Sequence, residues 1–138
     1  MPFDLPNELT LAWIAGFFDG DGCVAVGTNG PSKLPYLSLS VLQISYDDKC
    51  PITLEVFHKY LQGKLYQCTD TRKWMWSISG RQAAECLKKL LPYLVGKRAQ
   101  AELGIQLGEL GQQGKALTYD QRSERVRLGA EIKRLKRV

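Results

Sequence analysis

The sequence predicts an α+β fold, in which helices cover one face of a four-stranded antiparallel sheet. Two observations predict it. Segments with helical periodicity and segments that alternate polar with apolar residues follow one another in the order α, β, β, α, β, β, α. The 138 residues, 44% of them hydrophobic, are enough for the core of one domain. We therefore expect a single domain, residues 1–138, in which residues 118–138 form a basic C-terminal helix.

The first helix is expected over residues 9–18, where nearly every residue is apolar, so this helix should be buried on all sides. Gly20 and Gly22 are expected to break it, because glycine weakens a helix. The weak alternation in residues 23–28 then predicts the first strand.

The second strand is expected over residues 36–45, because Leu37, Leu39 and Val41 alternate with serines. The apolar residues then change phase at Leu42, and a β-bulge near Val41 and Leu42 would account for the change.

The rest of the chain predicts a helix, a hairpin and three more helices. A proline suits the start of the second helix, and the second arm of the hairpin places its two tryptophans on one face. The expected ranges are 51–61 for the helix, 64–69 and 73–79 for the hairpin, and 81–91, 97–113 and 119–136 for the last helices.

Helices on one face leave the other face of the sheet open. The side chains expected there are small and polar, basic or aromatic, and they suit either a nucleic-acid groove or an ordinary wet surface. They are Asn29, Ser38, Ser40, Gln43, Lys64, Tyr66, Met75 and Ser77.

The net charge of +5 arises at the C-terminal end. Residues 1–121 hold twelve basic and twelve acidic side chains, whereas residues 122–138 hold seven basic and two acidic ones. This pattern fits a polyanionic partner and a solvated helix face equally well.

The composition also indicates the cellular compartment of the protein. The four cysteines are widely spaced and accompanied by one histidine, which argues against a structural zinc site and for reduced thiols in an intracellular protein. No apolar run approaches the roughly 18 residues of a membrane span, and the N-terminus does not resemble a secretory signal. We expect a bacterial cytoplasm or an organelle.

The apolar first helix ends in two carboxylates, Asp19 and Asp21, each followed by glycine. A calcium loop of the EF-hand type is excluded, because a loop starting at Asp19 lacks the required glycine and glutamate. A phosphatase of the haloacid-dehalogenase type needs a strand before the acids, and residues 12–19 form a helical stripe instead.

The helical stripe in residues 12–19 supports a third interpretation of the two carboxylates. Its members are Ala12, Ala15, Gly16 and Asp19, and small residues at this spacing let two helices approach closely. If two copies packed about a two-fold axis, their Asp21 carboxylates would meet and would need divalent metal between them. Carboxylates with divalent metal are suited to phosphodiester hydrolysis.

The segment "IAGFFDGDG", residues 14–22, resembles the LAGLIDADG motif of homing endonucleases, and the similarity extends over most of the chain. One motif implies the homodimeric class. The resemblance implies a saddle-shaped sheet over double-stranded DNA, cleavage of both strands at a long palindromic or pseudo-palindromic site, and magnesium as cofactor. It also implies a mobile element, an intron or an intein, as host.

The resemblance assigns roles by position. The last acid of the motif, Asp21, and the carbonyl of Gly20 are expected metal ligands, whereas Asp19 is expected to be structural. "LPYLVGKRAQAEL" matches the context of an active-site lysine and points to Lys97, with Arg98 as the neighbouring candidate. Tyr46 stands where relatives often place a water-orienting glutamine, and Lys49 stands near a basic position.

For DNA, the resemblance marks Gln43 as a base-contacting position. Lys33, Arg72 and Lys73 are expected in loops at the sheet edge, where we expect them to contact phosphates. The expected dimer contacts are Ala12, Ala15, Gly16 and Asp19. Two alternatives stay open: the same fold acting without cleavage, as a DNA-binding protein or intron-splicing maturase, and, more remotely, the phosphatase.

Overall fold

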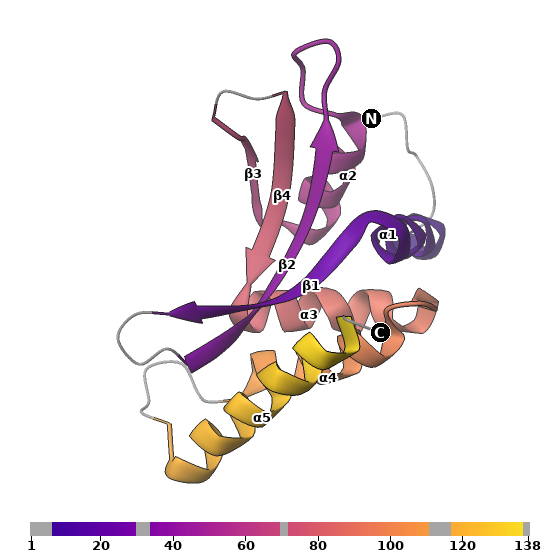
Figure 1. Cartoon of the computed structure of the whole chain (residues 1–138). Coiled ribbons are helices and arrows are strands. Elements are labelled where there is room, and N and C mark those ends of the chain that lie inside the picture. The colour runs from indigo at the N-terminus through magenta and orange to yellow at the C-terminus, as the bar shows by residue number, and fades with distance from the viewer. Residues whose placement is uncertain (1–6, 30–33, 70–71, 111–116, 137–138) are drawn as a thin grey trace.

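The structure, a computed structural model, describes residues 7–29, 34–69, 72–110 and 117–136. Its elements follow the predicted order (Figure 1). They are α1 (Asn7–Asp21), β1 (Gly22–Asn29), β2 (Leu34–Ile44), α2 (Ile52–Leu61), β3 (Lys64–Gln67), β4 (Lys73–Ser79), α3 (Gly80–Leu90), the 3-10 turn η1 (Leu91–Tyr93), α4 (Arg98–Glu109) and α5 (Tyr119–Lys136).

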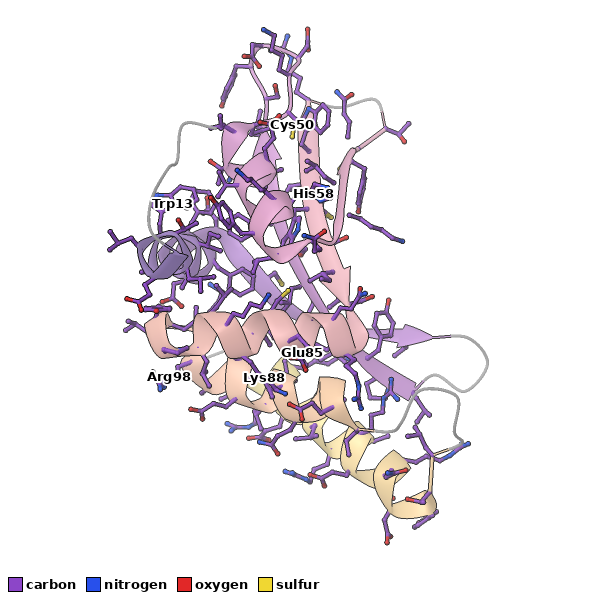
Figure 2. The ribbon with its side chains drawn as sticks, turned by 180° about the vertical axis from the view of Figure 1, so that it is seen from behind. Trp13, Cys50, His58, Glu85, Lys88 and Arg98 are labelled. Carbon is purple, nitrogen blue, oxygen red and sulfur yellow. The ribbon has the colours of Figure 1, made fainter. Side chains whose placement is uncertain are left out.

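The four strands form one antiparallel sheet in the order β1-β2-β4-β3. Figure 1 shows its strong twist, and Figure 2, seen from behind, shows α2 and α3 lying over one face. The predicted α+β class, the antiparallel sheet and the helices on one face are confirmed.

The predicted β-bulge is wrong. The β1–β2 and β2–β4 ladders run without interruption from Gly22 opposite Val41 to Asn29 opposite Leu34, and from Ser38 opposite Ser79 to Ile44 opposite Lys73. The phase change has another cause. Leu42 is 41% exposed and Ile44 is 51% exposed, so these apolar residues lie on the open face of a regular strand.

Two details of α1 also differ from the prediction. The helix continues through Gly20 to Asp21, and the chain enters β1 at Gly22. A β-carbon at Gly22 would collide with the Phe18 ring, so glycine is needed at this junction. In the single chain α1 is not buried on all sides, because Leu9 is 57% exposed and Gly16 and Gly20 are exposed too.

Aromatic side chains join α1, α2 and β4 in the core. The ring centroids of Trp13 and Phe17 lie 5.8 Å apart, those of Phe17 and Phe57 5.9 Å, and those of Phe57 and Trp76 5.1 Å. Trp76 is fully buried, and its indole N–H donates to the Gln62 carbonyl at 2.6 Å. This contact gives the buried indole N–H the hydrogen-bond partner that it would otherwise lack.

The remaining helices pack beside this group. Lys88 of α3 reaches Glu85 at 3.3 Å and Glu109 of α4 at 2.8 Å, so it ties the two helices together (Figure 2). Helix α5 begins with a reciprocal cap, in which the Gln121 N–H donates to Thr118 Oγ1 and the Thr118 N–H donates to Gln121 Oε1. Thr118 is thus the N-cap of α5.

The glycines of α4 allow close contact between α4 and its neighbours. A β-carbon at Gly108 would lie 2.7 Å from Ala84 Cβ and 2.9 Å from the Gly80 carbonyl oxygen. We expect Gly108→Ala to lower the free energy of unfolding by about 1–3 kcal/mol, measured by denaturant titration. Gln106→Ala, at an exposed position of α4, is the control. A gain near the ~1 kcal/mol of helix propensity would contradict this packing.

Candidate active site

The C-terminal end of α1 is anchored by Asp19. Its Oδ2 accepts the Val95 N–H at 2.7 Å and its Oδ1 accepts the Lys97 N–H at 2.9 Å. These bonds attach the end of α1 to the segment between η1 and α4. Two acids in the last turn work against the helix dipole, so their presence needs such compensation.

Lys97 provides a second anchor. Its Nζ donates to the Asp19 carbonyl oxygen at 2.5 Å, which brings a positive charge to the negative end of the helix dipole. The predicted lysine therefore contacts Asp19, the residue two positions before Asp21 in the chain. Arg98, the neighbouring candidate, instead pairs with Glu102 of α4 at 3.6 Å and points away from α1 (Figure 2).

The Asp19 contacts make a testable prediction. Both carboxylate oxygens of Asp19 accept backbone N–H groups, and in Asp19→Asn one of them becomes an amide NH2 that faces a donor. We expect a loss of about 1–3 kcal/mol in the free energy of unfolding, measured by denaturant titration. Asp21→Asn removes the same charge two residues away and is the control. Equal stability of the two variants would contradict an anchoring role.

Asp21 is exposed at the last residue of α1, and its Oδ2 accepts a hydrogen bond from Gln43 Nε2 at 3.1 Å. The prediction that Gln43 lies on the open sheet face is therefore wrong. Because β2 has no bulge, Gln43 shares the helix-covered face with Leu37, Leu39 and Val41. Its amide belongs to the Asp21 site.

Tyr46 and Lys49 lie in the loop after β2. The Tyr46 side chain is 84% exposed, and both residues line a pocket with Ile44, Cys50 and Ile52. Asp47 organises this loop, since it accepts the Lys49 N–H and the Ser45 hydroxyl, each at 3.1 Å. These bonds hold the pKa of Asp47 below its usual value. Gln43, three residues before Tyr46, is the glutamine that contacts Asp21.

The donors at this end of α1 suit a hard divalent cation. Asp21 offers a carboxylate and Gly20 a backbone carbonyl, both exposed, and oxygen ligands are those that magnesium prefers. No group of three or more His, Cys, Asp or Glu side chains able to hold a metal occurs within the described residues. A magnesium site often takes only one or two carboxylates and completes its shell with substrate phosphates, so these donors fit part of such a site.

The open sheet face carries most of the other predicted contacts. The strand register places Ser40, Ser77 and Lys64 in one row and Ser38 in the next row. Met75 and Tyr66 lie opposite each other, and Lys73 opens β4 on the same face. Arg72 is exposed just before β4. Lys33 and the side chain of Asn29 lie outside the described residues.

Leu42 and Ile44 join this face, and the sequence reasoning missed them because it treated apolar residues as buried. Side chains of a regular strand alternate between the two faces, so counting in steps of two from Ser38 and Ser40 would have placed Leu42 and Ile44 on the open face.

The predicted self-contact stripe of α1 is only partly available. Ala15 is fully buried in the core of its own chain, so its inclusion was wrong. Asp19 is engaged with Val95 and Lys97. Gly16 is exposed, and a β-carbon there would meet nothing within 4 Å. Together with the half-buried Ala12 it lies on the outer side of α1.

Helix α5 uses part of its basic charge within the chain. Arg127 pairs with Glu124 and Arg134 with Glu131, each one turn earlier. Arg125 donates to the Pro35 carbonyl at 2.5 Å, and burial lowers the pKa of its guanidinium. Lys136 reaches the Cys23 sulfur at 3.1 Å. No described helix is both long and apolar enough to cross a membrane.

Comparison with known proteins identifies the family. Residues 14–101 match the model of the LAGLIDADG endonuclease family. The DNA endonuclease I-CvuI of Chlorella vulgaris is 32% identical over 111 residues, which cover 77% of this chain and 68% of the relative.

Solved structures of homing endonucleases share the fold of this chain. I-CvuI in complex with its target in the presence of calcium superposes with a TM-score of 0.78 at 28% identity, covering 93% of this chain and 82% of that one. The archaeal intron-encoded homing endonuclease I-Vdi141I, complexed with DNA, has the same fold, with a TM-score of 0.76 at 14% identity over 94% of this chain and 86% of that one. The chain belongs to the LAGLIDADG endonuclease family.

Proposed function

We propose that the protein is a site-specific endonuclease that cuts both strands of DNA as a homodimer with magnesium. The observation that carries the proposal is the exposed Asp21 carboxylate, at the end of the helix that also presents the exposed Gly16 and Gly20. One helix thereby offers both a metal ligand and a surface for a second copy. The DNA complex of I-CvuI, the similar enzyme, supports the choice of substrate.

Asp21 and the Gly20 carbonyl would hold the cation. A divalent cation bound there supplies charge that polarises the scissile phosphate and stabilises the leaving oxygen. Gln43 orients the Asp21 carboxylate through its hydrogen bond. The choice of magnesium rests on the oxygen donors of Asp21 and Gly20. I-CvuI itself was crystallised on the I-CreI target in the presence of magnesium, with the DNA not cleaved.

The basic and phenolic groups have supporting roles in this proposal. Lys97, bonded to the Asp19 carbonyl, places its ammonium near the developing negative charge on the phosphate. Tyr46 and Lys49 extend from the loop after β2, where an exposed phenol and an exposed ammonium are available to water and phosphate.

A second copy completes the site. Within the described residues one chain offers no cluster of metal-ligating side chains, and a two-fold axis beside Gly16 would bring a second Asp21 near the first. Two identical subunits match a palindromic or pseudo-palindromic duplex. The open sheet faces would then contact DNA through the groups placed there: Ser38, Ser40, Lys64, Tyr66, Arg72, Lys73, Met75 and Ser77.

The deciding experiment selects cleavable sites from a random duplex library in magnesium. We expect recovery of a long site with two-fold symmetry, cut on both strands. Binding without cleavage across the library would favour the non-cleaving alternative, and a monomeric mass with DNA at micromolar protein would contradict the homodimer.

All four cysteines are free thiols, which supports an intracellular location, in a bacterial cytoplasm or an organelle.

A further inference from the structure

A row of apolar side chains, two of them exposed and the middle one half-buried, crosses the open sheet face. Leu42 of β2 lies opposite Met75 of β4, and Met75 lies opposite Tyr66 of β3. Leu42 is 41% and Tyr66 44% exposed, and the Tyr66 hydroxyl donates to the Met75 sulfur at 3.0 Å. We call these three residues the apolar row. Exposed apolar surface that is contiguous usually marks a binding site.

The surroundings of the apolar row indicate what covers it. The next row on the same face is polar and basic, with Ser40, Ser77 and Lys64, and on the other side Ile44 lies opposite Lys73. At the described strand positions on this face no aspartate or glutamate occurs, and the charged residues are lysines. A polyanion fits this combination, because lysines beside the apolar row attract phosphates and no carboxylate at these strand positions repels them.

Among the four bases, thymine alone presents an apolar group, its C5-methyl, in the major groove. We propose that the apolar row contacts thymine methyl groups and so gives the protein a preference for thymine at the base pairs that it faces. Leu42 and Met75 are then specificity-determining residues, and the serines beside them form hydrogen bonds. This inference rests on the proposed function, because it requires DNA on the open face.

The test removes one methyl group at a time. In the selected target each thymine is replaced in turn by deoxyuridine, which keeps base pairing intact, and affinity is measured by fluorescence anisotropy. All proteins carry Asp21→Asn so that the duplex stays whole. We expect the dissociation constant to rise about four-fold per lost methyl at one or two positions in each half-site. Leu42→Ala and Met75→Ala should reduce this ratio towards one at those positions.

Ser40→Ala, in the neighbouring row, is the matched control and should leave the ratio unchanged. Leu42→Gln should exchange the preference at its position from thymine to adenine, which glutamine contacts with two hydrogen bonds. Specific binding with no deoxyuridine effect at any position would overturn this inference and leave the endonuclease intact. Loss of specific binding to every duplex, with all variants folded by circular dichroism, would instead overturn the proposed function and this inference with it.

Discussion

Asp21→Asn should lower the rate of DNA cleavage by at least about a thousand-fold, because the variant loses the one exposed carboxylate that the end of α1 offers to a cation. The structure of the site should survive. Asparagine has the size of aspartate, and its carbonyl oxygen still accepts the hydrogen bond from Gln43. DNA affinity should stay equal or rise slightly, because one negative charge near the phosphates is gone.

The measurement compares nicking and double-strand cleavage of a plasmid that carries the selected site with affinity for the same site. Asp48→Asn, which removes an exposed charge from the loop after β2, is the control and should cleave normally. Full cleavage by Asp21→Asn in magnesium would remove Asp21 from the mechanism. Failure of the wild-type protein to cleave any site would instead favour the DNA-binding or maturase alternative.

The two acids of the motif divide the work at the end of α1. Both carboxylate oxygens of Asp19 accept hydrogen bonds from backbone N–H groups of the segment after η1. Asp21 accepts one from a glutamine amide and stays exposed. Lys97 is bound through both its backbone N–H and its Nζ to the same residue, Asp19. Asp19→Asn keeps the main-chain carbonyl that accepts from Lys97 Nζ but alters the bond to the Lys97 N–H, so it should shift Lys97 and lower activity through stability and position rather than through metal binding.

The order of elements was predictable because the periodicities are local. β4 and α5 begin and end where the pattern indicated, and the motif located the acids. The partners of those acids were not predictable from spacing. Asp19 meets Val95 and Lys97 across more than seventy residues, and only the packing of η1 against α1 brings them together.

The prediction was weaker on which side of a strand or helix each side chain points to. Leu42 and Ile44 are apolar yet exposed, so the rule that apolar residues point inward suggested a bulge and moved Gln43 to the wrong face. Much of a folded protein's exposed surface is apolar, so on the open face of a sheet the rule fails. On α1 both sides are small or apolar, so the sequence could not decide that Ala15 points inward and Gly16 outward.

Gly16→Leu should separate the two copies without harming the single chain. A β-carbon at Gly16 meets nothing within 4 Å in its own chain, and leucine favours a helix more than glycine does, so the free energy of unfolding of the monomer should not fall. Across a two-fold axis, two added leucines would face each other where the backbones need to approach closely. Overpacking costs about 1–3 kcal/mol per site, so two sites should weaken dimerisation about thirty-fold or more.

Analytical ultracentrifugation measures the monomer–dimer constant, and cleavage of both strands at fixed protein concentration should fall with it. Gln106→Leu, an equal apolar addition at an exposed position of α4, is the matched control and should dimerise normally. Gly16→Ala should have a smaller effect, because a methyl group displaces the partner less than an isobutyl group does. If Gly16→Leu dimerised as the wild type does, the outer side of α1 would not be the contact between copies. The second Asp21 would then have to reach the site from another surface.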